Sequence, residues 1–435
     1  MKALTTLLTA AAVLALSSCG IYGRYERPAL NLELGDGTPV RTVPWQERFQ
    51  DPFLKDLIDT ALANSTDLAV AMLKVEEARA DLYRTRMAFL PSLDASATGD
   101  IVERSARASL NASWQADIFG KLRNANLAAL SSLEGQAAYS QAVRCALIAS
   151  VASSYYNLLA LDSQLRISTS TLENWDKTIS VLEALKMAGK TNDVAILQAK
   201  ARKMNLESSS MRLRKNITTA ENALRALAGK PDLEIRRGSM DGCSFPESMA
   251  EGVPLGALAA RPDVRRAESA LATAFYNTAA AKAAFYPDIT LRGSSEWLSA
   301  SASDLAWSAI GSLAAPLLNR GIFKAGLKAA RARQEEARLQ FRQTLIEAGT
   351  EVNDALAEYY SAQERIETDS LQCRTLSDAV EKIELMMHYS TTNYLEVLTA
   401  QQSLLDSELT LVNDKLALAD AWVALYQALG GGSGE

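Results

Sequence analysis

Residues 110–118 read Leu110-Asn111-Ala112-Ser113-Trp114-Gln115-Ala116-Asp117-Ile118, with apolar and polar side chains at alternate positions. A period of two predicts a β-strand that has one apolar and one wet face. The segment after Pro91 alternates in the same way from Leu93 to Ile101, so a β-hairpin is expected over 92–118. Alternating segments of about ten residues are typical of strands in membrane β-barrels.

A second region, 288–318, has the same character. Apolar and polar positions alternate from Ile289 to Trp297, and a less regular partner strand is expected between Leu305 and Leu317. Aromatic residues sit where the girdle of a membrane barrel is expected, namely Trp114, Phe285, Tyr286, Trp297 and Trp307. Four strands from one chain would leave open edges, which lipid does not tolerate, so the sequence predicts an oligomer. Two soluble hairpins with a solvated face are the alternative.

Two very long helices are expected after the hairpins. Proline interrupts a helix interior, and none occurs between Pro91 and Pro231 or after Pro316. Within these stretches, residues 121–187 and 323–387 are rich in helix-forming residues. A helix of about 65 residues is about 100 Å long and needs a coiled-coil partner or a tube. Partner helices are expected at 66–89, 193–228, 262–285 and 394–429, and a soluble helical bundle is the alternative.

The chain is an internal repeat. Ala88-Phe89 with Pro91 matches Ala284-Phe285 with Pro287 at a shift of 196 residues, and Tyr155-Tyr156 matches Tyr359-Tyr360 at a shift of 204. Such self-similarity indicates two copies of one structural plan. The expected organisation is a first repeat over 54–229, a proline-containing segment over 230–254, a second repeat over 255–430 and a tail over 431–435.

The N-terminus has the form of a bacterial lipoprotein signal. Met1-Lys2 precedes a mainly apolar run that ends in Leu16-Ser17-Ser18-Cys19, and this run is too short to span a bilayer. Residues 1–18 are therefore expected to be removed and Cys19 to carry lipid, with 19–53 as a lipid-anchored segment. Gly20, where an aspartate would favour retention in the inner membrane, favours the outer membrane. An ordinary signal with a chance cysteine is the alternative.

In this order the elements resemble the TolC-like outer membrane efflux factors, specifically the NodT-type lipoprotein branch. The residues that carry the resemblance are Tyr25-Glu26-Arg27-Pro28, Trp45, Phe49, Asp51-Pro52, Leu57-Ile58, Phe89-Leu90-Pro91, Asp117-Ile118-Phe119-Gly120, Arg261-Pro262-Asp263-Val264, Ala284-Phe285-Tyr286-Pro287, Asn393-Tyr394-Leu395 and Ala428-Leu429-Gly430-Gly431-Gly432. The resemblance implies a mainly α fold with β, in which a homotrimer forms a twelve-stranded transmembrane β-barrel that continues into a long α-helical barrel in the periplasm. It also implies a periplasmic adaptor and an inner-membrane pump of the resistance-nodulation-division class as partners. Residues 25–53 would lie along the tunnel exterior, and 230–254 would form part of a belt around its middle.

The resemblance places the periplasmic tip at the two helical turns, 187–192 and 388–393. Here the sequence departs from the family, because Ser390-Thr391-Thr392 replaces Arg-x-Gly and Thr399 stands where an aspartate is frequent. Leu395 and Thr399, one helical turn apart, are the candidates for closing the lumen. Glu396 is a third candidate, with a solvated face as the alternative. Adaptor contacts are expected at Gly189, Lys190, Thr191, Thr391 and Thr392.

The sequence gives no support for catalysis, a cofactor or a metal site. The net charge of −6 argues against a nucleic-acid surface, and the four cysteines form no CxxC motif, so Cys145, Cys243 and Cys373 are expected to be buried free thiols. The only histidine is His388, which excludes histidine-based clusters. Gly189-Lys190-Thr191 lacks the first glycine of a phosphate loop, since Ala184 occupies that position.

The expected function is a passive exit duct for small toxic molecules or drugs, the outer membrane channel of a tripartite efflux system. A channel for type I protein secretion would use a similar fold. From a different class of protein, the alternative is a periplasmic coiled-coil lipoprotein that acts as a structural tether and has no pore.

Overall fold

A computed structural model of the 435-residue chain describes residues 23–28, 44–100, 105–246, 258–298, 306–314, 320–388 and 394–431. The chain divides into two compact units. One, the strand unit, contains the described parts of 1–33, 70–140 and 262–346. The other, the helical unit, contains the described parts of 34–69, 141–261 and 347–435. Cys19 and the expected signal lie outside the described residues.

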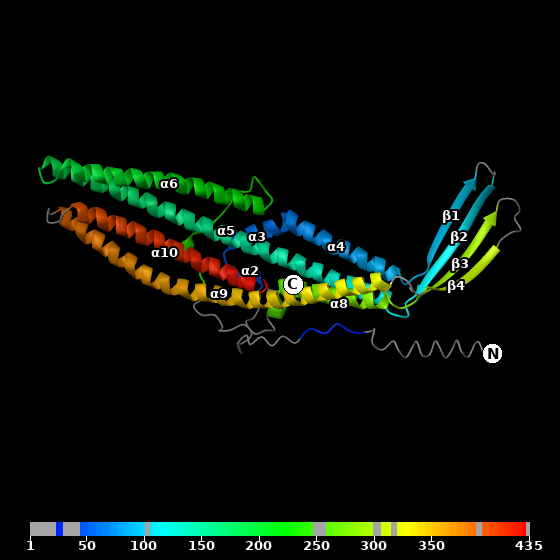
Figure 1. The fold of residues 1–435 in the computed structure, drawn as a ribbon. Helices are drawn as coiled ribbons and strands as arrows, with labels where there is room; N and C mark the ends of the chain where they lie inside the picture. Colours follow the sequence, from blue (N-terminus) through cyan, green and yellow to red (C-terminus); the bar gives the residue numbers. More distant parts are fainter. Residues whose placement is uncertain are drawn as a thin grey trace. The chain divides into compact units, whose positions relative to one another are not determined.

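The strand unit is built on a four-stranded antiparallel sheet of order β1-β2-β3-β4 (Figure 1). Its strands are β1 (Ser92–Asp100), β2 (Ser105–Ala116), β3 (Asp288–Leu298) and β4 (Ala306–Ala314). All four form in the regions where the period of two predicts strands, although β2 begins five residues before the expected Leu110 and ends two residues before Ile118. The hairpins expected from the sequence are joined into one sheet, because β2 pairs with β3 over ten residues and Trp114 lies opposite Leu291.

The register sorts the side chains onto two faces. Cross-strand partners share a face, so Leu93, Ala112 and Gly293 form one apolar row across three strands. On the other face, Ser96 Oγ lies 2.8 Å from Ser109 Oγ, and Ser92 Oγ lies 2.8 Å from Ser113 Oγ. One face is therefore apolar and the other is polar, which is the pattern of a barrel strand with lipid outside and water inside.

The junction between β2 and helix α5 (Lys121–Met187) explains the motif at 117–120. The Asp117 carboxylate accepts hydrogen bonds from the backbone N–H groups of Leu122 at 3.0 Å and Arg123 at 2.8 Å, and so caps the helix. Gly120 has φ +73°, a left-handed conformation that favours glycine. Phe119 stacks on Tyr286, with 4.8 Å between ring centroids. The chain thus turns sharply from strand into helix.

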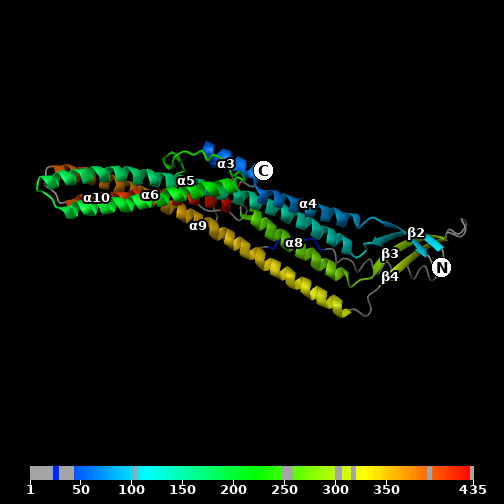
Figure 2. The same cartoon turned by 90° about the horizontal axis from the view of Figure 1, so that it is seen from above.

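Long helices make up the rest of the structure. Helices α4 (Thr66–Met87) and α8 (Pro262–Ala283) join the first parts of α5 and α9 in the strand unit. In the helical unit, α6 (Asp193–Leu227) lies alongside α5, and α10 (Tyr394–Ala428) lies alongside α9 (Arg320–His388), as both views show (Figures 1 and 2). Helix α5 has 67 residues and α9 has 69, within a few residues of the expected lengths. Among the described helices, only α5 is apolar enough to cross a membrane, and 56% of the apolar window is buried, as in a core helix.

The core of the helical unit includes part of the segment before α3. Trp45 in the short helix α2 (Trp45–Arg48) is 3% exposed and Phe49 is fully buried, so these two side chains anchor their segment to the helices of this unit. Asp51 caps α3 (Pro52–Asn64) through Phe53 N–H, and its other carboxylate oxygen accepts a 2.6 Å hydrogen bond from the Tyr155 hydroxyl. Tyr155 in turn accepts from Gly238 N–H at 3.2 Å, which fixes the irregular segment before the 3-10 helix η2 (Met240–Gly242).

The three described cysteines are free thiols, but each is only partly buried, so the expectation of full burial was wrong. Cys145 contacts the end of the second repeat, where its thiol lies 3.6 Å from the Gly430 carbonyl oxygen. Burial raises the pKa of the Cys243 thiol to about 11. Cys243 is therefore mostly protonated and poorly nucleophilic at neutral pH.

Replacing Gly431 with alanine is expected to lower the free energy of unfolding by about 1–3 kcal/mol. Gly431 has φ +67°, and a Cβ there would lie 2.2 Å from Cys145 Sγ. Gly189→Ala is the matched control, since Gly189 has φ +72° and nothing lies within 4 Å of the added carbon. Thermal unfolding of the purified protein measures both. Equal losses in the two variants would show that the contact with Cys145 contributes nothing.

Candidate functional site: the hairpin ends of the helical unit

The turn between α5 and α6 is closed by two standard caps. Gly189, at φ +72°, donates to the Lys186 carbonyl at 2.9 Å, and Lys190 N–H donates to the Leu185 carbonyl at 2.9 Å. Asn192 then caps α6 by accepting from Ala195 N–H at 3.3 Å. Gly189 and Lys190 are exposed and Thr191 is half-buried. The expected adaptor-contact residues of this turn therefore lie together on an accessible loop, and a helix rather than a strand precedes it.

The start of α10 lies at the same end of the helical unit as this turn (Figure 1). Leu395 is 48% exposed and Thr399 is exposed, whereas Val397 and Leu398 between them are buried. Leu395 and Thr399 therefore share one outward face of the helix, and the Thr399 hydroxyl donates to the Leu395 carbonyl at 2.7 Å. Glu396 is also exposed. The other expected contact residues, Thr391 and Thr392, lie outside the described residues.

Sequence reasoning missed Gln401, which links three helices near this end. The Gln401 amide nitrogen lies 2.9 Å from the Thr178 hydroxyl of α5 and 2.9 Å from the Glu384 carboxylate of α9. Its amide oxygen is buried with no hydrogen-bond partner in the described part of the chain. A cluster of buried apolar residues surrounds this contact, including Trp175, Leu182, Ala195, Val397 and Leu398. Gln401 is one of two adjacent glutamines in a helical stretch, and nothing in the sequence distinguishes it from Gln402 for such a role.

An apolar stripe runs along the exposed side of α6. Leu197, Met204 and Met211 follow one another at intervals of seven residues and are 65%, 64% and 68% exposed, and Val194 at the start of the helix is 52% exposed. An interval of seven residues is the spacing of apolar residues along a coiled-coil seam. We call Val194, Leu197, Met204 and Met211 the α6 seam. A seam this exposed in one chain indicates a helix supplied from outside it.

The helical unit also holds charged groups in contact along its length. Arg365 lies 2.7 Å from the Asp414 carboxylate and 2.8 Å from that of Glu358. A hydrogen bond to Asp414 raises the pKa of the Asp369 carboxyl. Arg48 stacks over the Trp422 ring at 3.9 Å, and burial lowers the pKa of Arg48 to about 10. These contacts join α9, α10 and α2 within one unit, as ion pairs of a helical scaffold do.

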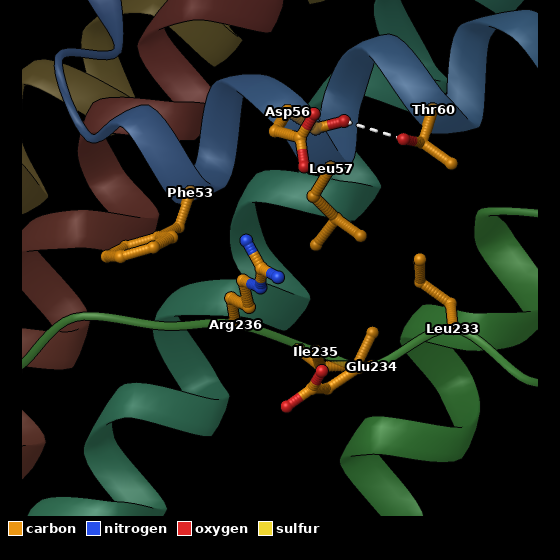
Figure 3. A pocket seen from close by; sticks show the side chains of 8 residues that line it. All are labelled: Phe53, Asp56, Leu57, Thr60, Leu233, Glu234, Ile235 and Arg236. Atoms are coloured by element: carbon orange, nitrogen blue, oxygen red, sulfur yellow. Dashed lines mark hydrogen bonds between the residues drawn. The ribbon is translucent and has the colours of Figure 1, made fainter.

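One small pocket of about 310 Å³ lies between α3 and the segment after α6 (Figure 3). Phe53, Asp56, Leu57 and Thr60 line one side, and Leu233–Arg236 line the other. The Thr60 hydroxyl is bonded to the Asp56 carbonyl at 2.8 Å, within its own helix. Among the described residues, no group of three or more His, Cys, Asp or Glu side chains could hold a metal ion. The pocket shows no arrangement for chemistry.

The sheet and the helices together define a class of protein. An antiparallel sheet with an apolar and a polar face, joined to helices of 67 and 69 residues, is the architecture of an outer membrane channel subunit. The chain belongs to the Outer membrane efflux protein family, whose sequence profile matches residues 57–230 and 253–431.

Similar proteins support this assignment over nearly the whole chain. The cation efflux system protein CusC of Escherichia coli K12 is 30% identical, with 98% of this chain and 99% of CusC aligned. A crystal structure of CusC superposes with a TM-score of 0.85 over 94% of this chain and 99% of that one, at 30% identity. The probable outer membrane lipoprotein SilC of Salmonella typhimurium is 29% identical (98% and 98% aligned), and the toluene efflux pump outer membrane protein TtgI of Pseudomonas putida is 28% identical (97% and 97%). The chain is an outer membrane channel component of an efflux system.

Proposed function

We propose that three copies of this chain form the exit duct of a tripartite efflux pump. Each copy supplies four strands to a closed barrel and its long helices to a periplasmic tunnel. A periplasmic adaptor and an inner-membrane pump of the resistance-nodulation-division class deliver the substrate and the energy. The duct itself is passive and is not an enzyme.

The observation that carries this proposal is the sheet. Its order ends at β1 and β4, so in the described part of the chain each of these strands pairs on one side only. Unpaired backbone N–H and C=O groups cost several kcal/mol each in a bilayer, and closing the sheet on other copies removes that cost. Four strands are too few for a barrel, whereas three copies give twelve.

The mass of the purified protein tests the assembly. In mild detergent, light scattering after size-exclusion chromatography should give three times the mass of one chain once the mass of bound detergent is subtracted. This trimer should persist when the protein is diluted to micromolar concentration. A monomer under the same conditions would overturn the proposal and would favour a tether without a pore.

The substrate class is small toxic molecules. The names of two relatives say that one belongs to a cation efflux system and the other to a toluene efflux pump, so ducts of one fold serve chemically unlike cargo. Specificity therefore resides in the pump. Type I protein secretion is the second candidate, because it needs the same kind of duct, but none of these relatives is named for it.

The periplasmic tip is assigned to the helical ends described above. We place the gate at Leu395 and Thr399, with Glu396 adding charge, and the adaptor contacts at Gly189, Lys190, Thr191, Thr391 and Thr392. The exposed face shared by Leu395 and Thr399 supports this placement. So does the α6 seam, because a helix packed there would lie beside the Gly189 turn.

Leu395→Ala combined with Thr399→Ala is expected to raise single-channel conductance several-fold, because smaller side chains widen the constriction. Planar-bilayer recordings measure this directly. Leu371→Ala, which changes another exposed leucine of the helical unit, is the control and should leave conductance unchanged. Indistinguishable conductance in the gate variant and the control would place the gate elsewhere. Glu396→Gln should lower cation selectivity if this carboxylate faces the lumen.

Cys19 is proposed as the lipidated residue after removal of 1–18, with 19–53 as the anchored segment. The similarity to a probable outer membrane lipoprotein supports this. Cys19→Ser is expected to abolish labelling of the mature protein by radioactive palmitate, while the trimer still forms, because the barrel supplies the insertion. Unlabelled wild-type protein would show that Cys19 is an ordinary residue.

A further inference from the structure

The outer strands of the sheet define which residues meet where two copies join. β1 pairs with β2 and β4 pairs with β3, and each turns its second row of backbone groups away from the sheet. Such an edge is a template for another strand. The inference rests on the trimer proposed above. It adds the register in which an edge strand of one subunit pairs with an edge strand of the next.

The internal repeat fixes the equivalence of the strands. Pro91 directly precedes β1 and Pro287 directly precedes β3, so these strands are related by a shift of 196 residues. Ser92 pairs with Ser113, and its equivalent, Asp288, pairs with Ala314. The second strands, β2 and β4, are therefore related by a shift of 201 residues, from 113 to 314.

Within the chain the two repeats already meet at one pair of strands, β2 and β3, which we call the joint between repeats. At that joint Asn111 lies opposite Ser294. The equivalent of Asn111 is Ser312 in β4, and the equivalent of Ser294 is Thr98 in β1. We propose that β4 of one subunit pairs antiparallel with β1 of the next in this same register, so that Ser312 lies opposite the partner subunit's Thr98.

The two faces of the sheet provide an independent check. Thr98 lies on the same face of β1 as Ser92 and Ser96, because it is an even number of residues from both. The hydroxyls of Ser92 and Ser96 bond to serines of β2 on the polar face. Ser312 pairs with Thr290, which pairs with Gln115, again in the polar row. The proposed joint thus sets polar row against polar row and apolar row against apolar row. A slip of one residue would reverse the faces, so only slips of two residues compete with it.

Disulfide cross-linking tests the register. In a background with Cys145, Cys243 and Cys373 replaced by serine and Cys19 kept, Thr98→Cys with Ser312→Cys should give a covalent trimer on a non-reducing gel after mild oxidation of membranes. A bridge within one chain is excluded, because strands three steps apart at about 4.8 Å per step are about 14 Å apart, beyond the reach of a disulfide.

Three further pairs make the result decisive. Asn111→Cys with Ser294→Cys is the equivalent pair within the chain and shows that this pair geometry allows a bridge, which appears as loss of free thiols in a monomer band. Ser96→Cys and Asp100→Cys, each with Ser312→Cys, represent slips of two residues. At least fivefold more covalent trimer from the Thr98 pair than from either slipped pair supports the register.

Two kinds of outcome overturn the inference. A native trimer that cross-links best at a slipped pair, or at none of the three while the Asn111 control is bridged, contradicts the register and leaves the trimer standing. A native mass of one chain contradicts the trimer itself and the register with it.

Discussion

Arg261→Met should lower the stability of the folded duct. The Arg261 side chain is 6% exposed, and its guanidinium donates to the Ala428 carbonyl at 2.9 Å and the Ala348 carbonyl at 3.3 Å. It also pairs with the Glu351 carboxylate at 2.6 Å. Ala428 ends α10, where a positive charge is favoured by the helix dipole. Removing the guanidinium leaves the Ala428 carbonyl at the end of α10 without this donor, at an expected cost of about 1–3 kcal/mol.

The yield of heat-resistant trimer and the thermal midpoint in detergent measure this loss. Arg261→Lys should fall between wild type and Arg261→Met, because one ammonium group cannot reach three acceptors in different directions. Arg338→Met is the matched control, since Arg338 is 41% exposed and its ion pair among the described residues is with Glu335, one turn away on the same helix. If Arg261→Met were as stable as Arg338→Met, the role assigned to Arg261 would be wrong.

Leu197→Glu combined with Met204→Glu is expected to reduce efflux at least tenfold. Both residues belong to the α6 seam and are about two-thirds exposed in the single chain. Two carboxylates buried against a partner helix would have to be desolvated without a counter-charge, which costs several kcal/mol. Each variant is expressed in a strain that lacks its own duct. The measurement is the concentration of a toxic efflux substrate that inhibits growth of that strain.

Gln198→Glu combined with Asn205→Glu is the control for charge. These positions are exposed and stand next to the seam on the same helix. Because they lie off the seam, the same two charges there should leave efflux within about twofold of wild type. Equal growth inhibition by seam and control variants, at equal protein levels in the outer membrane, would show that nothing packs on the seam.

The sequence predicts the elements of this fold well because strong local signals mark them. Proline-free stretches and a period of two give α5, α9 and the strands to within a few residues. The pairing of β2 with β3 could not be predicted from the sequence. Alternation indicates which face of a strand a residue occupies, but not which strand lies beside it.

The candidate site was only partly predictable. Leu395 and Thr399 follow from helical spacing, which places them on one face. Gln401 and Arg261 act through partners that are distant in sequence, so their roles became visible only when the helices were packed. Trp45 and Phe49 carry part of the resemblance to the family, but only the packed helices show that both side chains belong to the core of the helical unit.

Ion conductance of the purified protein in planar lipid bilayers tests the central claim most directly. A trimer that closes a barrel should insert and give stepwise, ohmic current increments of uniform size. A persistent absence of channels, together with a water-soluble monomer after delipidation, would contradict the duct and leave a structural tether.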